Sequence, residues 1–255
     1  MTDEKNQETP ESLSRRRFIK NTGYVVGGVA VGGVVGSLLP FGNRKNEKET
    51  TNNNQKVAGT NAENFNQALM YFTQEQFNIV NAATERIFPE DDNGPGAKAL
   101  GVAFFIDHQL AGEWGFNGRE YMQPPFYHGE KVQGYQGRLK RREIFDIALQ
   151  EIQNHSMDKY KKRFVELSGD EQDAVLKDFE EDKVKITTIS PSGFFSMLRS
   201  ATLEGVYSDP LYGGNINMNG WKMRDYPGNQ MAYAEIIEQD FKKIAPQSLR
   251  DHLSH

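Results

Sequence analysis

The sequence predicts an all-α protein. Apolar residues recur at helical spacing through most of residues 73–206. Two capping boxes, Thr73 with Gln76 and Ser168 with Glu171, mark helix starts ahead of apolar runs. A run typical of a strand occurs only at 184–189, and it is weak. We therefore expect a single compact helical domain with two long irregular excursions, preceded by a signal or anchor helix and a flexible tether.

The first half of the domain contains two expected helices and one excursion. The first helix starts after Thr73 and stops at Pro89, because proline lacks the amide that a helix interior needs. Its apolar face comprises Phe77, Val80, Thr84 and Ile87. The second helix covers residues 97–110, with Val102, Phe105, Ile106 and Leu110 on one face. Residues 112–137 are rich in Gly, Pro and aromatic residues and form the first excursion.

The second half contains four expected helices, a second excursion and a closing helix. A long helix covers 138–155, and a shorter one holds Tyr160, Phe164 and Leu167. The Ser168 capping box starts the third, and Ser190 followed by Pro191 starts the fourth, since proline is favoured at the first helical position. Residues 207–229 form the second excursion, and 231–239 a short closing helix.

The N-terminal region is typical of a twin-arginine export signal. Arg15 and Arg16 are the twin pair, with Phe18 and Lys20 after them, and an uncharged apolar run follows at 21–42. Its apolar centre, 24–39, would span about 24 Å as a helix, which is shorter than a hydrocarbon core of about 30 Å. No clean cleavage site follows, so removal of the signal and retention as a membrane anchor both stay open.

Three regions follow from this pattern. Residues 1–42 are the signal peptide or anchor. Residues 43–64 are polar and carry too few apolar side chains to offset ordering entropy, so they form a disordered linker. Residues 65–255 form the helical domain. We expect export to the extracytoplasmic face of a bacterial cytoplasmic membrane, with the twin-arginine translocase as one partner.

Composition excludes several functions. The formal net charge is −5, which gives no electrostatic attraction to nucleic acid. There is no cysteine, so disulfides, cysteine nucleophiles, cysteine-ligated iron–sulfur clusters and covalent haem attachment are excluded. The basic residues at 140–142 and 159–163 alternate with acidic ones, which is typical of a solvated or partner-facing helix surface.

No motif points to chemistry in this chain. The five histidines lack metal-site spacing, and the acidic run at 90–94 lacks the spacing of a calcium loop. Neither G-x-G-x-x-G nor G-x-S-x-G occurs, which argues against a flavin site and a hydrolase nucleophile. Glu113 and Glu130 are a conceivable acid–base pair in the first excursion, without a sequence context that favours it over solvent exposure. We expect no catalytic, cofactor-binding or metal-binding residues.

The second excursion carries the most distinctive motif, residues 209–215 (Asp-Pro-Leu-Tyr-Gly-Gly-Asn), with Trp221 and Tyr226 after it. Proline and paired glycines argue against a helix here. Aromatic side chains on a constrained backbone favour a protein interface. A self-packed loop that supports the core, or a small-ligand site, are the alternatives.

Three stretches resemble the small subunit (subunit 3, or gamma chain) of membrane-bound gluconate 2-dehydrogenase. They are 72–77 leading to 86–89 and 94–97, then 101–107, and most specifically 207–215 with 220–221 and 226–228. The resemblance covers about residues 65–235. It implies a non-catalytic subunit that accompanies an FAD-dependent large subunit of the glucose–methanol–choline type, with a cytochrome c subunit in some complexes.

The resemblance also implies a role: the small subunit supplies the export signal and helps its partner to fold or mature. The expected partner interface comprises Tyr207, Asp209, Pro210, Tyr212, Gly213, Gly214, Asn215, Trp221, Tyr226, Pro227 and Gly228. Two other functions stay open. One is a stand-alone exported enzyme with its site at 112–137, and the other is a surface-anchored structural protein.

Overall fold

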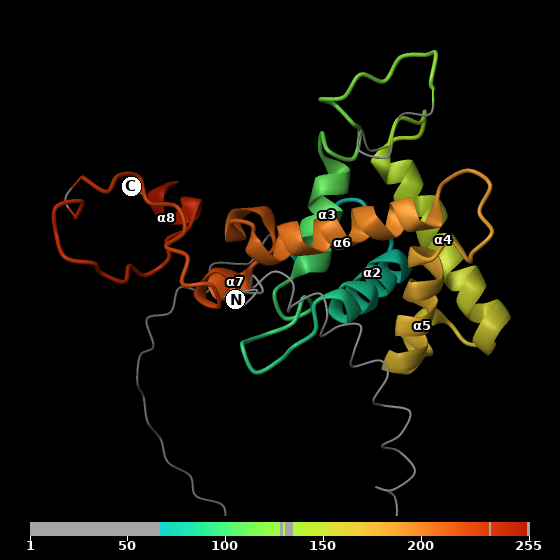
Figure 1. The fold of residues 1–255 in the computed structure, drawn as a ribbon, viewed down its shortest axis with the longest axis horizontal. Coiled ribbons are helices and arrows are strands. Elements are labelled where there is room, and N and C mark those ends of the chain that lie inside the picture. Colours follow the sequence, from blue (N-terminus) through green and yellow to red (C-terminus); the bar gives the residue numbers. More distant parts are fainter. Residues whose placement is uncertain (1–66, 128–129, 131–134, 235, 254–255) are drawn as a thin grey trace, which may run out of the picture. The chain divides into compact units, whose positions relative to one another are not determined.

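Helix α6 is the central element of the fold (Figure 1), because it contacts α2, α3, α4 and α5. The computed structural model describes residues 67–127, 130, 135–234 and 236–253. The α-helices are α2 (Gln74–Ile87), α3 (Val102–Ala111), α4 (Arg141–Tyr160), α5 (Gly169–Glu180), α6 (Pro191–Tyr207), α7 (Asn219–Lys222) and α8 (Leu249–Leu253). Short 3-10 helices are η3 (Phe164–Glu166), η4 (Pro210–Tyr212) and η5 (Ile216–Met218). No strand forms within these ranges, so the predicted all-α class is confirmed.

Aromatic rings join the helices in the core. The Phe145 ring of α4 meets Phe194 of α6 edge-on, with centroids 5.3 Å apart, and Trp114 at 6.0 Å. Phe194 in turn lies 6.2 Å from Phe179 of α5. Such edge-to-face pairs add to the free energy of burial. At the edge of this core, Arg86 of α2 and Asp173 of α5 form a two-fold ion pair, with both N–O distances 2.7 Å.

Three helices start where capping chemistry predicts. The Thr73, Ser168 and Ser190 side chains each accept a hydrogen bond from an amide of the first turn of α2, α5 and α6. Each side chain satisfies one of the amides that a helix start leaves without an intrahelical partner. Local sequence therefore defines these starts.

The bounds of α3 and α4 differ from the prediction. Residues 97–101 form turns rather than the start of α3, because Gly101 has a φ of 73°. Helix α4 starts three residues later than predicted, since the side chains of Asn117 and Glu143 already bind the amides of Arg141 and Lys140. It also continues to Tyr160, where Lys161 ends it in the left-handed region.

Two predicted helices are wrong. Tyr160, Phe164 and Leu167 do not share a helix: Tyr160 ends α4 and Phe164 starts η3. The closing helix at 231–239 is absent from the described residues of that range, which form turns. Conversely, the motif predicted to contain no helix has one 3-10 turn, η4, and α7 follows within the second excursion.

A buried carboxylate holds the segment that leads into α2. Asp107 of α3 is fully buried and accepts hydrogen bonds from the backbone amides of Met70, Tyr71 and Phe72 at 2.6–3.0 Å. The neighbouring His108 lies with Nε2 2.9 Å from the carbonyl oxygen of Ala68. These hydrogen bonds hold residues 68–72 against α3.

The predicted export residues Arg15, Arg16, Phe18 and Lys20, the apolar run 21–42 and the linker 43–64 all lie outside the described residues. Among residues 67–253 as far as they are described, no helix is both long and apolar enough to span a bilayer.

Replacement of Asp107 by alanine tests this anchor. It removes the acceptor of three amides, and we expect the free energy of unfolding to fall by about 3–5 kcal/mol. Urea unfolding followed by circular dichroism measures the change. The exposed Asp158 of α4 supplies the control, since its replacement by alanine should change stability by less than about 0.5 kcal/mol. A loss below about 1 kcal/mol for Asp107→Ala would contradict the proposed anchor.

Candidate partner-binding surface

The loop 207–228 folds back onto the end of α6 at backbone contact. A side chain on Gly214 would place its Cβ 2.3 Å from the carbonyl oxygen of Gly205, and one on Gly220 would lie 2.0 Å from that of Val206. Real Cβ atoms do not approach carbonyl oxygens so closely, so both positions require glycine. The paired glycines of the sequence motif therefore serve packing within this chain.

Asn215 holds the two halves of this loop together. It is fully buried and has a φ of 48°, a conformation that asparagine tolerates better than most residues. Its Nδ2 donates to the carbonyl oxygen of Ser208 at 2.8 Å, and its Oδ1 accepts from the amide of Gly220 at 2.7 Å. The Asn215 side chain thus supplies a hydrogen-bond partner to two backbone groups, one on each side of it in the loop.

Trp221 is a second internal support. Its indole is buried, and Nε1 donates to the carbonyl oxygen of Tyr207 at 2.8 Å. Tyr226 meets the indole edge-on at 5.5 Å, and the Arg224 guanidinium lies 5.4 Å from the Tyr207 ring. The Trp221 indole is therefore enclosed by this chain, and the half-exposed Tyr226 ring lies on its outer side.

Asp209 connects the loop to the C-terminal helix. Its carboxylate accepts hydrogen bonds from the amide of Leu211, the hydroxyl of Ser248 at 2.7 Å and the amide of Leu249 at 2.8 Å. The sequence analysis missed Ser248, although Ser248 and Asp251 have capping-box spacing, and the Asp251 carboxylate does accept from the Ser248 amide.

The structure separates the predicted interface residues into three groups. The buried ones contact this chain: Asp209, Gly213, Gly214, Asn215, Trp221 and Gly228. Tyr207, Pro210 and Pro227 are half-buried. Tyr212 and Tyr226 are 49% and 51% exposed. Self-packing describes the first group, and the two tyrosines are the members of the motif best placed to contact another protein.

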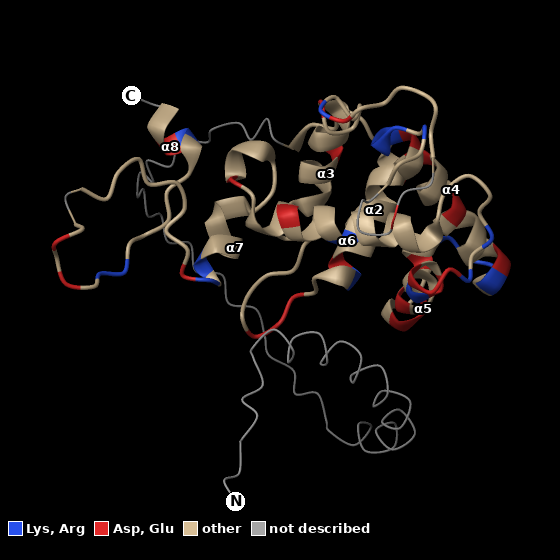
Figure 2. Ribbon diagram, turned by 45° about the horizontal axis from the view of Figure 1, so that its top comes forward, with Lys and Arg blue, Asp and Glu red and all other residues tan. Residues whose placement is uncertain are grey.

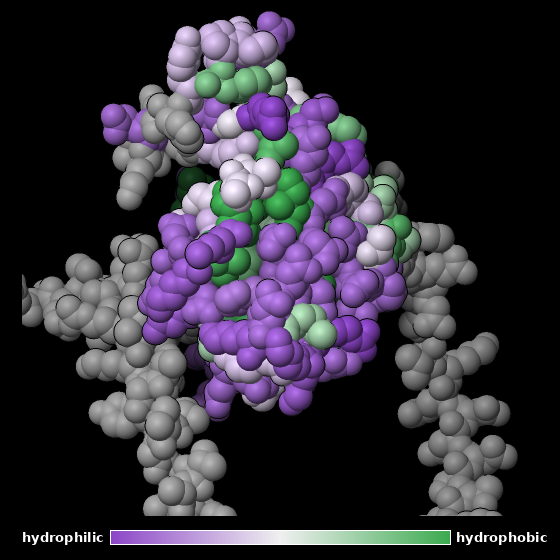
Figure 3. Space-filling model, turned by 90° about the vertical axis from the view of Figure 1, so that its right-hand side faces the viewer, coloured by the Kyte–Doolittle hydropathy of each residue, from purple (hydrophilic) through white to green (hydrophobic). Residues whose placement is uncertain are grey.

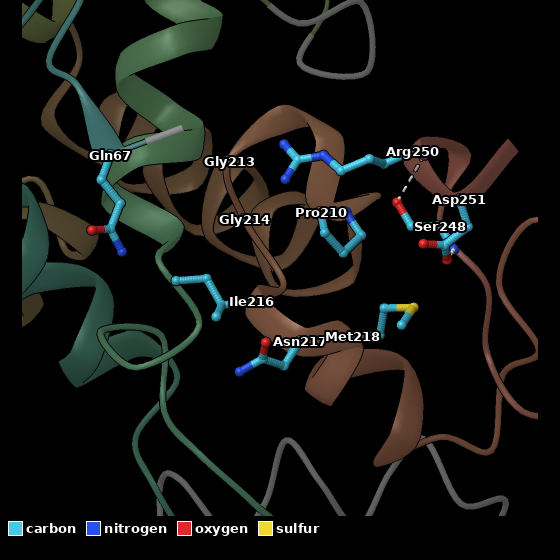
Figure 4. Close-up of a pocket in the computed structure, with 10 residues that line it drawn as sticks. All are labelled: Gln67, Pro210, Gly213, Gly214, Ile216, Asn217, Met218, Ser248, Arg250 and Asp251. Carbon is cyan, nitrogen blue, oxygen red and sulfur yellow. Dashed lines mark hydrogen bonds between the residues drawn. The ribbon is translucent and has the colours of Figure 1, made fainter. Parts of the chain in front are cut away.

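A cavity of about 250 Å³ lies beside this loop (Figure 4). The Gly213–Gly214 turn, Gln67 and the start of α8 contribute to its lining, and the side chain of Arg250 extends into it. Of its polar lining groups, Ser248 and Asp251 already bind within this chain. If the 209–215 motif binds a small ligand, this cavity is the candidate site.

The first excursion is ordered at its start and exposed further on. Asn117 is buried and accepts from the Arg141 amide, whereas the side chains of Tyr121 and Tyr127 are mostly in solvent. Glu113 and Glu130 are both exposed, and Glu113 lies 3.4 Å from the Arg119 guanidinium. This geometry gives the suggested acid–base pair no enclosed site.

The described histidines have structural partners. His155 lies 2.9 Å from the Asp178 carboxylate, and His252 lies 2.8 Å from the carbonyl oxygen of Asn229. No group of three or more potential metal ligands occurs within the ranges described above.

The side of the domain that carries α4 and α5 is mostly hydrophilic (Figure 3). Blue and red residues alternate on these helices in Figure 2, and several form ion pairs, including Lys159 with Asp178 at 2.5 Å and Arg141 with Glu120 at 2.7 Å. Partial burial raises the pKa of Asp178, but the hydrogen bonds from Lys159 and His155 outweigh it and hold that pKa below its usual range. These pairs favour the solvated alternative for this basic surface.

The whole sequence was compared with protein families, curated proteins and solved structures. It matches the family described as gluconate 2-dehydrogenase subunit 3 over residues 74–228, more than half of its length. The chain belongs to this family. No curated protein and no solved structure matches it. Membership confirms the resemblance seen in the sequence, and it makes this chain an accessory subunit of a dehydrogenase complex.

The family region begins with α2 and ends at Gly228. It contains the central helices and the whole self-packed loop, including Tyr212 and Tyr226. Residues 229–255 lie beyond it. The features shared with this subunit family are therefore those of the helical domain and its loop.

Tyr71 supplies a test of the local electrostatics next to α4. Its hydroxyl donates to Asp146 at 2.5 Å, and burial, followed by this hydrogen bond, raises its pKa to about 12. Because the folded protein favours the neutral phenol, this stabilisation is present below pH 10 and is lost as the pH rises from 10 to about 12. The difference in tyrosinate absorbance between the native protein and Tyr71→Phe should have its midpoint near 12, and near 10 in denaturant. A midpoint near 10 in both would contradict the assignment.

Asn215 and Asn217 form a matched pair, because both have positive φ but Asn217 is exposed. Asn217→Ala should cost about 1 kcal/mol, from backbone strain alone. Asn215→Ala adds the loss of two buried hydrogen bonds, so we expect a decrease of about 3 kcal/mol in the free energy of unfolding. Chemical denaturation measures both. Equal losses would show that the Asn215 side chain does not support the loop.

Proposed function

We propose that this chain is the non-catalytic small subunit of an exported, membrane-associated dehydrogenase that oxidises sugars or sugar acids with FAD. The observation that carries this proposal is the family match over residues 74–228. The twin arginines upstream of that region support the export part.

In this proposal the large subunit holds FAD and performs the oxidation. The substrate transfers a hydride to the flavin, and the electrons pass on to a cytochrome c subunit or a quinone. The present chain takes no part in that transfer. Its sequence contributes neither a dinucleotide-binding glycine motif nor a cysteine for haem or cluster attachment.

The contribution of this chain is export and maturation. A flavoprotein has to fold around FAD in the cytoplasm, and the twin-arginine route carries folded proteins. A companion that binds the folded flavoprotein and bears the signal can direct both through the translocase. Membership in a subunit family and an N-terminal twin-arginine motif in the same chain support this division of labour.

Replacement of both Arg15 and Arg16 by lysine tests the escort role. The variant is co-expressed in the native host with a flavoprotein of the glucose–methanol–choline type from that host, and flavin-dependent dehydrogenase activity is measured in intracellular and exported fractions. We expect exported activity to fall to background while the complex accumulates inside the cell, because the translocase requires the arginine pair. Arg17→Lys is the matched control and should leave export unchanged.

If Arg15→Lys with Arg16→Lys leaves exported activity at the native level, the escort role is wrong. The purified chain without any flavoprotein addresses the stand-alone enzyme. Turnover of sugar or sugar-acid substrates with an artificial electron acceptor under those conditions would contradict the non-catalytic assignment.

A further inference from the structure

The segment 229–248, between α7 and α8, is here named the C-terminal arm. Its base is closed by main-chain hydrogen bonds: the Asn229 amide donates to Gln247 at 2.8 Å, and the Gln247 amide donates to Pro227 at 3.2 Å. Asp209 fastens the next residue, Ser248, to the self-packed loop. Both ends of the arm are therefore hydrogen-bonded to the loop 207–228, although the arm lies beyond the region that matches the family.

The arm exposes large apolar side chains. Met231, Ile237 and Phe241 are 75%, 77% and 100% exposed, and Tyr233 is about half exposed. Single exposed apolar residues are ordinary, but several gathered in one short segment mark a site of interaction.

The order of these residues is that of an amphipathic helix. Tyr233, Ile237, Phe241 and Ile244 are spaced by four, four and three positions, which places them along one face of a helix. Pro246 would stop such a helix. The acidic residues at 235, 238 and 240 lie in its middle, and Lys242 and Lys243 lie in its last turn, where the helix dipole favours basic side chains.

No described residue of the arm lies in an α-helix. The Ile237 amide donates to the carbonyl oxygen of Tyr233 at 2.9 Å, which is one helical turn, but the described residues of the arm show no further helical turn of this kind. Short helices are marginal in water unless an apolar face is buried against another surface. On this face the side chains of Ile237 and Phe241 are exposed, Tyr233 is about half exposed and Ile244 is half-buried.

We propose that the C-terminal arm folds into an amphipathic helix in an apolar groove of the flavin-containing dehydrogenase subunit. The groove would accept Tyr233, Ile237 and Phe241 along about two helical turns. This inference rests on the proposed function, because it names the part of the chain that binds that subunit. The half-exposed Tyr226 lies just before the base of the arm, so the arm extends the surface of the family loop.

The charge of the arm favours a protein groove over a lipid surface. Residues 231–244 carry three acidic and two basic side chains, and the acidic ones precede the basic ones along the loop between α7 and α8 (Figure 2). Helices that lie in a membrane interface have a polar face rich in lysine and arginine. In the free chain Lys243 forms an ion pair with Asp225, so one of the two basic groups is already engaged at the loop.

The first test removes the apolar anchors. Full-length chain with Ile237→Ser and Phe241→Ser is titrated with the flavoprotein used in the export test, and the dissociation constant is measured by calorimetry. We expect binding at least about 100-fold weaker, because buried aromatic and aliphatic anchors dominate such interfaces. The melting temperature of the free chain should not change, since both side chains are exposed.

Met157→Ser with Val165→Ser is the matched control. Both residues are exposed apolar side chains, and they lie on α4 and η3 rather than on the arm. Binding within about threefold of native is expected for this control, as for contacts outside a hot spot.

The second test addresses helix formation. Asp240→Pro is compatible with the exposed arm of the free chain but prevents a helix through residues 236–240. It should weaken binding by about 100-fold, whereas Asp240→Ala should bind within about threefold of native.

The outcomes separate this inference from the proposed function. If the native chain binds the flavoprotein and the arm variants bind equally well, the arm proposal is overturned while the subunit assignment stands. If the native chain does not bind the flavoprotein, both are overturned. Binding of the native chain to phosphatidylcholine–phosphatidylglycerol vesicles that is lost in the Ile237→Ser, Phe241→Ser variant would overturn the protein groove in favour of a lipid surface.

Discussion

The loop 207–228 depends on backbone contact with the end of α6. Gly214 and Gly220 lie so close to carbonyl oxygens of Gly205 and Val206 that no other residue fits. Such an approach removes water from polar backbone groups, which then need partners within the protein. Asn215 and Trp221 supply them, and Asp209 extends the arrangement to the C-terminal helix. The most distinctive sequence motif of the chain is thereby committed mainly to its own interior.

This constraint separates the chain into parts with different physical properties. The helical domain and its loop form a rigid platform whose polar groups are satisfied, so binding through it requires little ordering. The C-terminal arm keeps apolar side chains in solvent and would order on contact with a partner. An accessory subunit benefits from both, because a rigid platform defines orientation while a segment that folds on binding contributes additional contact area.

Local chemistry explains which predictions succeeded. The starts of α2, α5 and α6 depend on side chains within three residues of the helix, so capping boxes identify them in the sequence alone. The end of α4 and the absent helix at 231–239 depend on distant surfaces. Ser156, the first residue beyond the predicted end of α4, is buried and the helix continues past it, whereas the side chain of Ile237 is exposed. Helical periodicity is the same in both cases, so it cannot distinguish them.

The sequence by itself determined the all-α class, the starts of α2, α5 and α6, the absence of cysteine chemistry and the membership in a subunit family. These follow from composition, short-range hydrogen bonding and linear motifs. Only the tertiary structure decided which residues of the 207–228 motif are buried, that Asp107 accepts hydrogen bonds from three amides of the segment before α2, and that Ile237 and Phe241 of the arm are exposed. Burial and long-range hydrogen bonds join residues far apart in the chain, and such pairings leave no periodic signal in the sequence.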